Sequence, residues 1–170
     1  RHDLKDEIGI GADQFSNINY DPTRRQGIEM DVKARISPTL DTAVQYAHSE
    51  ATFTEGPYTG KQVPLAPQNV VTARLSYKMT DTQNVSLMGQ WVSEQKIAGD
   101  FGNTCQDHIA SYTLVNARFS QKINTWTLSA GVNNLLDKHY YNLRTRCDAT
   151  KKSVYPEAGR TFLVTLQNRF

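Results

Sequence analysis

The chain has 170 residues, of which 38% are hydrophobic and 21% are charged, and its formal net charge is +2. No apolar run approaches the roughly 20 residues that a membrane-spanning helix needs, which excludes a helical membrane protein. The near-neutral charge and the lack of a Lys/Arg-rich run argue against a nucleic-acid partner. A membrane-spanning strand needs only about 9–11 residues, with every second one apolar, so a membrane protein built from strands is not excluded.

Alternating apolar and polar residues recur along the chain and predict β-strands with one dry face and one wet face. The clearest segment is 28–36, which reads Ile-Glu-Met-Asp-Val-Lys-Ala-Arg-Ile. In chain order the predicted strands are 4–10 (partial), 28–36, 40–47, 71–79, 85–91, 115–119, 126–133 and 160–170. About eight strands are therefore expected, each antiparallel to its neighbours.

The connections between these strands alternate in length. The short ones are 37–39, 80–82 and 121–124, and the long ones are about 11–24, 55–68, 96–108 and 142–159. Short turns on one rim and long loops on the other are typical of an outer-membrane β-barrel. A soluble β-sandwich also alternates, but it gives no reason for loop lengths to segregate or for Tyr77, Trp91 and Trp126 to point outward near strand ends.

The segment 160–170 ends the chain on an aromatic residue, Phe170, and Phe162, Val164 and Leu166 share one of its faces. A chain that stops on Phe in such a strand resembles an outer-membrane β-barrel protein. The other end opens on Arg1-His2-Asp3-Leu4, which is charged and is no signal peptide. We therefore expect the chain to be the mature C-terminal part of a longer protein.

Four segments are similar to one family of such proteins. They are Asn133-Asn134-Leu135-Leu136-Asp137-Lys138-His139-Tyr140, Tyr155-Pro156-Glu157-Ala158-Gly159-Arg160-Thr161-Phe162, Arg24-Arg25-Gln26-Gly27-Ile28-Glu29 and Val63-Pro64-Leu65-Ala66-Pro67. They resemble the "NLxDxxY", "P-x-x-GR", "RxxGxE" and "iPxaP" segments of TonB-dependent outer-membrane receptors. Each segment is weak alone, but together they lie in order and at the matching strand positions, and the resemblance extends over essentially the whole chain.

The resemblance implies an all-β fold, a transmembrane antiparallel β-barrel of which residues 1–170 form the last eight or so strands. Such receptors have about 22 strands and a plugged lumen. The plug domain, the segment that recruits TonB and the first strands would then lie outside this chain. The family imports scarce large nutrients, so the resemblance implies an outer-membrane transporter without enzymatic activity or a cofactor. Its expected partners are a ferric siderophore, TonB (through the missing plug), lipopolysaccharide and outer-membrane lipid.

The last long loop bears most on the type of ligand. Between positions 138 and 160 it holds six cations and two carboxylates, with tyrosines interleaved. Arg and Tyr together suit an anionic, aromatic ligand such as a ferric catecholate or carboxylate siderophore. The expected ligand contacts are Tyr140, Tyr141, Arg144, Arg146, Lys151 and Lys152, with Tyr58 and Phe101 from neighbouring loops. The alternative is contact with anionic lipopolysaccharide, or plain solvation.

The two cysteines, Cys105 and Cys147, fall in two long loops that are both expected to be external. In an exported protein such a pair is compatible with one disulfide, and two free thiols are the alternative. The four histidines are scattered without metal-ligand spacing, so no metal site is expected.

The charges expected on the wet face are mixed in sign: Glu29, Asp31, Lys33, Arg35, Arg74, Lys78, Arg118 and Arg169. They would be solvated or paired with one another, and some could contact the plug. Three rival functions stay open. The chain could be a self-contained eight-stranded barrel with a structural or adhesive role, whose interior would be filled by side chains. It could also be a passive porin, or a receptor of the same family for haem or cobalamin.

Overall fold

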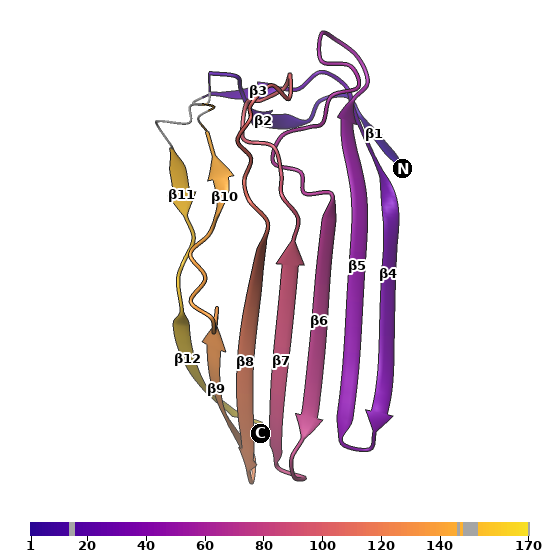
Figure 1. Ribbon diagram of the computed structural model, residues 1–170. Coiled ribbons are helices and arrows are strands. Elements are labelled where there is room, and N and C mark those ends of the chain that lie inside the picture. Colours follow the sequence, from indigo (N-terminus) through magenta and orange to yellow (C-terminus); the bar gives the residue numbers. More distant parts are fainter. Residues whose placement is uncertain (14–15, 146, 148–152, 170) are drawn as a thin grey trace.

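The protein is described by a computed structural model for residues 1–13, 16–145, 147 and 153–169. Its strands are β1 (His2–Leu4), β2 (Ile8–Ile10), β3 (Asn17–Asn19), β4 (Thr23–Ser37), β5 (Leu40–Phe53), β6 (Asn69–Lys78), β7 (Gln83–Val92), β8 (Tyr112–Ile123), β9 (Trp126–Asn133), β10 (Tyr141–Arg144), β11 (Val154–Pro156) and β12 (Thr161–Asn168). Eight of them form one antiparallel sheet in the order β1-β4-β5-β6-β7-β8-β9-β12 (Figure 1). The pairs β2–β3 and β10–β11 form two small hairpins beside it. The described part of the chain contains no helix that is long and apolar enough to cross a membrane.

The predicted alternation is confirmed by the strand register. Val44 on β5 pairs with Val32 on β4 and with Ala73 on β6, whereas its neighbour Gln45 pairs with Asp31 and with Thr72. Since successive side chains of a strand point to opposite faces, one face of the sheet is apolar and the other polar.

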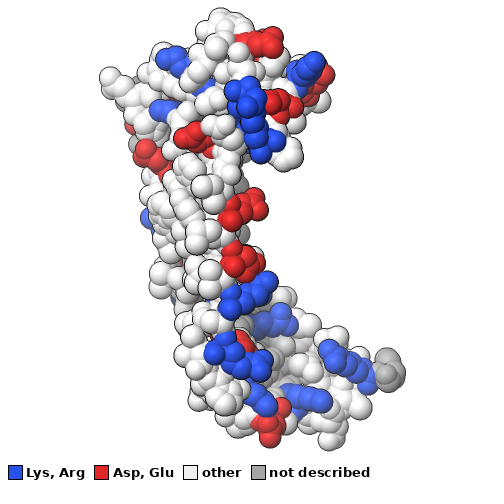
Figure 2. Space-filling model, turned by 90° about the vertical axis from the view of Figure 1, so that its right-hand side faces the viewer, with Lys and Arg blue, Asp and Glu red and all other residues white. Residues whose placement is uncertain are grey.

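The apolar face is exposed, which inverts the usual arrangement of a sheet packed on a core. Its exposed side chains include Ile28, Met30, Val32, Leu75, Leu87, Phe119, Leu128, Phe162, Val164 and Leu166. The polar face is hollowed, and Figure 2 shows charged side chains along the side toward which both ends of the molecule bend. Exposed apolar area of this extent marks a surface that meets another apolar phase.

Short turns join the long strands at one end of the sheet (Figure 1). β4 and β5 are connected through Pro38 and Thr39, and β8 and β9 through Asn124 and Thr125. Asn124 has a φ of 55°, a left-handed conformation that Asn tolerates better than most residues. The long connections and the two hairpins gather at the other end, so the predicted segregation of loop lengths is confirmed.

Three sequence predictions need correction. Segment 4–10 is not one strand: β1 pairs with β4 in the large sheet, whereas β2 pairs with β3 in a separate hairpin. The predicted loop 11–24 contains β3 and the start of β4. The predicted loop 142–159 contains most of the β10–β11 hairpin. These strands are only three or four residues long, too short for alternation to reveal them.

The sheet is open, with β1 and β12 at its two edges. A self-contained barrel would need these edges to pair, and the described residues contain no such pair. The alternative of a closed eight-stranded barrel is therefore not the arrangement of this chain.

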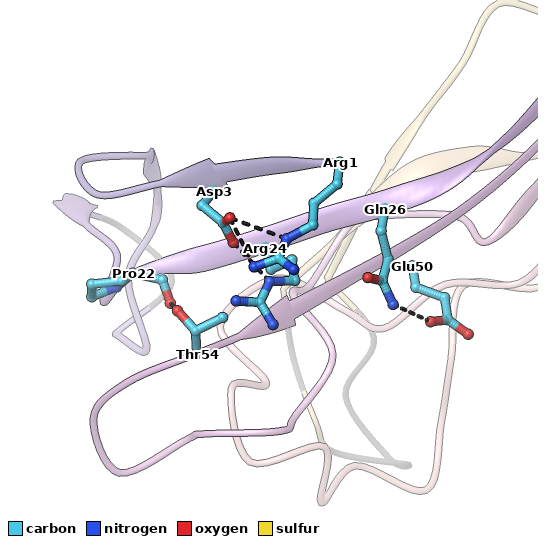
Figure 3. A network of polar contacts seen from close by, with 7 residues as sticks. All are labelled: Arg1, Asp3, Pro22, Arg24, Gln26, Glu50 and Thr54. Atoms are coloured by element: carbon cyan, nitrogen blue, oxygen red, sulfur yellow. Dashed lines mark hydrogen bonds and ion pairs between the residues drawn. The ribbon is translucent and has the colours of Figure 1, made fainter.

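A network of polar contacts fastens β1 to the sheet (Figure 3). The Asp3 carboxylate accepts a hydrogen bond from Arg24 Nε at 2.7 Å and lies 3.1 Å from Arg1 Nη2. One strand further, Gln26 Nε2 donates to Glu50 Oε2 at 3.3 Å. These polar pairs lie along β1, β4 and β5, at the end of the sheet where the long loops begin.

Candidate functional site

The buried hydrophobic residues in the described part of the chain gather at the loop end of the molecule rather than between sheets. The first cluster contains Tyr20, Phe53, Phe101, Val63 and Ala51. The Tyr20 and Phe101 rings meet edge to face with centroids 5.2 Å apart, and the Phe53 and Phe101 rings do so at 5.7 Å. Edge-to-face pairs of this kind add about 0.5–1.5 kcal/mol each beyond the burial of area. The cluster therefore holds together the connections that follow β3, β5 and β7.

Two predicted ligand contacts belong to this first cluster. Phe101 is buried, and Tyr58 is half-buried with its ring centroid 5.4 Å from that of Phe101. The structure thus brings Tyr58 and Phe101 together, as packing partners. Tyr20 and Phe53 complete the cluster, and sequence reasoning missed both. Their signal was an aromatic residue inside the predicted loop 11–24 and another just before the predicted loop 55–68.

A second cluster joins the β7–β8 connection to the β10–β11 hairpin. Ile97, Ile109 and Cys105 form its buried part, and Leu65 and Tyr141 pack against it. A disulfide links Cys105 to Cys147, with Cα atoms 5.3 Å apart, so the predicted disulfide is confirmed. The bond spans 42 positions and connects two loops that follow different strands.

Arg144, the last residue of β10, lies between these two loops. Its side chain is only 2% exposed, and its Nη2 donates to Asp107 Oδ2 at 2.6 Å. Its backbone carbonyl accepts the Ala98 N–H at 2.9 Å. A buried guanidinium needs such a partner, because an unpaired buried charge is expensive. Asp107 was missed by sequence reasoning, since nothing in its neighbours marks it as the partner of a residue 37 positions away.

Tyr140 stacks on Tyr112, with ring centroids 4.6 Å apart. Burial raises the pKa of the Tyr140 hydroxyl, and the nearby Glu157 carboxylate raises it further. Tyr140 is therefore a neutral hydrogen-bond donor at neutral pH. Of the other predicted contacts, Arg146, Lys151 and Lys152 lie outside the described residues.

The segment 133–140 forms a compact turn where β9 ends. Asn134 and Asp137 have φ values of 51° and 52°. The Asn134 side chain accepts the Lys138 N–H at 2.8 Å and donates to the Lys138 carbonyl at 2.9 Å. Asp137 accepts the Arg160 N–H at 2.9 Å, so it ties this turn to the start of β12. These side chains satisfy backbone groups, which gives the segment a structural role.

The polar face of the sheet is its concave face, and it extends from the loop end of the molecule toward the short turns. Its charges divide along the strands: Glu29 and Asp31 lie nearer to the loops, and Lys33 and Arg35 lie nearer to the short turns. Asp31 lies 3.4 Å from Lys33 Nζ, and Arg35 donates to Asp41 at 2.9 Å. Pairing within the predicted set is thus confirmed for Asp31 with Lys33, whereas Arg35 pairs with Asp41, which was not in that set.

This architecture is an antiparallel sheet with an apolar convex face, a polar concave face and loops gathered at one end. Residues 1–135 match the sequence profile of a family described as "TonB dependent receptor-like, beta-barrel". The chain belongs to the TonB-dependent receptor-like β-barrel family. The expected resemblance is confirmed, and so is the fold class at the level of an antiparallel barrel sheet.

Three solved structures share this fold. The ferric yersiniabactin uptake receptor FyuA from Yersinia pestis superposes with a TM-score of 0.76 and 18% identity, over 99% of this chain and 26% of that one. The ferric-catecholate import receptor Fiu from E. coli K12, in its closed form, gives 0.71 and 21%, over 99% and 24%. The copper transporter OprC gives 0.75 and 21%, over 99% and 27%.

A curated relative is similar in sequence as well. The "iron-regulated outer membrane virulence protein" of Vibrio cholerae serotype O1 (strain O395) is 24% identical over 134 residues. The match covers 75% of this chain and 20% of the relative. The chain thus spans about a fifth of the length of the curated relative that it matches.

Proposed function

We propose that this chain is the C-terminal part of the barrel of an outer-membrane receptor that imports an iron complex. The barrel would have about 22 strands, and a plug domain and the first strands would be supplied by the rest of the protein. One observation carries the proposal: the sheet is open at β1 and β12 while its convex face exposes apolar side chains from β4 to β12. Such a sheet needs further strands at its edges and lipid against its face.

The iron complex is proposed to be a ferric siderophore, with TonB-coupled energy driving its import. The names of the relatives support iron: ferric yersiniabactin, ferric catecholate, and an iron-regulated protein. The cations and tyrosines of the last long loop support an anionic, aromatic ligand. The convex face would contact lipid, and lipopolysaccharide where the face meets the loops.

The predicted ligand contacts fall into two groups under this proposal. Arg146, Lys151 and Lys152 remain candidates for direct contact with the ligand. Arg144 and Phe101 are buried, so they would act by shaping the loops rather than by touching the ligand. Tyr140, Tyr141 and Tyr58 are half-buried, and each has part of its side chain available.

The test is uptake of a radiolabelled ferric catecholate by iron-starved cells that carry or lack the full receptor. We expect uptake that requires the receptor and stops when TonB is absent. The triple variant Arg146→Ala, Lys151→Ala and Lys152→Ala should weaken binding at the cell surface by about tenfold or more, since each cation can supply a charge-assisted hydrogen bond. The exposed loop residue Lys61, changed to Ala, is the control. Equal uptake with and without the receptor would contradict the proposal.

A further inference from the structure

Lys96 and His108 form a polar pair at the base of the β7–β8 connection. The Lys96 ammonium donates a hydrogen bond to His108 Nε2 at 2.9 Å, and both side chains are half-buried. A lysine ammonium has three donors and no acceptor, so Nε2 must be the acceptor of this bond. His108 therefore carries its ring proton on Nδ1 and is neutral in this arrangement.

The pair lies where the two arms of the connection come together, at the end of the molecule where the long connections gather (Figure 1). Directly beside it, Gln95 and Ile109 exchange two backbone hydrogen bonds, at 3.0 and 2.9 Å. The loop beyond contains Cys105 and Asp107, which hold the β10–β11 hairpin through the disulfide and the ion pair. A force between the two side chains of the pair therefore acts on the closure of this whole loop.

The charged surroundings of the pair come from its own connection. The pair borders a small hollow of about 70 Å³, where Glu94 is the single carboxylate among the described lining residues. In the described part of the chain, Glu94 forms no ion pair with Lys96 or with His108. Asp107, the sequence neighbour of His108, is bound to Arg144 of β10. The β5–β6 connection faces the hollow with residues that do not titrate, namely Gln62, Ala66 and Gln68.

We infer that Lys96 and His108 form a pH-sensitive switch: the neutral pair keeps the β7–β8 connection closed, and a proton taken up by His108 opens it. A proton on Nε2 removes the acceptor and places two cations side by side, where the structure has 2.9 Å between the nitrogens. Even at the dielectric constant of water, two unit charges at this separation repel strongly enough to shift an equilibrium about tenfold. Closure is therefore complete at neutral pH and is lost as the pH falls. The inference goes beyond the proposed function, because it holds whatever solute the loops capture.

His48 on β5 offers a contrast within the same chain. Its Nδ1 donates to Asn69 Oδ1 at 3.0 Å, and its Nε2 lies 3.9 Å from the Glu50 carboxylate. Both of its ring nitrogens face oxygen acceptors, so an added proton meets a carboxylate instead of a second cation. Protonation of His48 should therefore leave the β7–β8 connection closed.

Hydrogen exchange in the full receptor, purified in detergent, measures the opening at the amides of Ala98 and Ile109. The Ala98 amide donates to the Arg144 carbonyl, and the Ile109 amide donates to the Gln95 carbonyl. The measurement is made at about pH 7.5 and about pH 5, because an ordinary His is protonated at the lower value while ordinary carboxylates stay largely ionised. Each variant is compared with the unmodified receptor at the same pH, which cancels the chemical effect of pH on exchange.

We expect the unmodified receptor to match His108→Gln at the higher pH and to open about tenfold more than this variant at the lower pH. Gln keeps an acceptor for Lys96 but takes up no proton. Lys96→Met, which removes the repelling cation, should also show no opening in acid. His48→Gln is the matched control and should keep the full acid response. His108→Lys carries the second cation at both pH values, so its connection should be open already at the higher one.

Equal protection of the unmodified receptor and His108→Gln at the lower pH would overturn the inference, because a carboxylate of the rest of the receptor would then neutralise the added charge. Opening in acid that persists in Lys96→Met would also overturn it, since the proton would then act elsewhere. The Lys96→Met result decides by itself if His108→Gln is already open at the higher pH, because that variant keeps the imidazole and lacks only the cation.

Discussion

At the scale of single residues, Arg144 shows how a cation that looks like a ligand contact becomes part of the scaffold. In sequence it is one of several cations in a loop with tyrosines. In the structure its guanidinium is buried against Asp107, whose side chain is 38% exposed. Water reaches the Asp107 carboxylate but not the Arg144 guanidinium. Removing Asp107 should therefore destabilise the loop more than removing Arg144.

Replacing Asp107 with Ala leaves the Arg144 charge buried and unpaired, so the loop should lose up to about 3 kcal/mol of local stability. Arg144→Met removes the cation itself, and the Asp107 side chain is already 38% exposed, so this change should cost only about 1 kcal/mol. Hydrogen exchange at the amide of Ala98, which donates to the Arg144 carbonyl, measures this opening. The double variant should resemble Arg144→Met alone. A larger effect for Arg144→Met than for Asp107→Ala would contradict this account.

At the scale of elements, the β10–β11 hairpin stands outside the large sheet and, among the described residues, pairs with none of its strands. It is fastened to the β7–β8 connection by the disulfide, by the Arg144–Asp107 pair and by the packing of Tyr141 on Ile97 and Ile109. Short hairpins are marginal by themselves, so these three links decide whether the hairpin keeps its place.

Changing Cys105 and Cys147 to Ser should therefore loosen the hairpin and the β7–β8 connection while the strands of the sheet stay protected. Loop-closure entropy over 42 positions sets an upper value of about 4 kcal/mol. Limited proteolysis of the full receptor measures the effect, and the unmodified receptor treated with a reductant is the second arm. Equal cleavage in the oxidised and the disulfide-free protein would show that packing alone holds the hairpin.

At the scale of the whole molecule, the two faces of the sheet meet different surroundings. Val44 lies on the convex face between two aromatic rows, one with Tyr46 and Trp91 and the other with Tyr77. Aromatic residues concentrate where a barrel leaves the hydrocarbon layer, so Val44 lies near the middle of that layer.

We expect Val44→Arg to destabilise the full receptor in lipid vesicles by about 2–4 kcal/mol, because the charge faces hydrocarbon. The matched change at the next residue, Gln45→Arg, places the same charge on the polar face and should cost far less. Urea unfolding followed by tryptophan fluorescence compares the two. Equal losses at both positions would argue that the convex face does not meet lipid.

Sequence periodicity predicted the long strands because a strand with one dry and one wet face needs alternation and nothing from outside itself. It also predicted the separation of short turns from long loops. The short strands β3, β10 and β11 escaped prediction, and β1 and β2 were predicted as one partial strand over 4–10, since three or four residues carry too little pattern.

The candidate site was only partly accessible from the sequence. Residue type and spacing identified Cys105 and Cys147 as a possible pair, and the loop cations as possible ligand contacts. Only the tertiary structure decided that Arg144 pairs with Asp107, that Phe101 packs on Tyr20, and that Arg74 and Arg118 line one hollow of the polar face. The physical reason is that alternation is a local property of the chain. Burial and charge pairing depend instead on which strands and loops the register brings side by side.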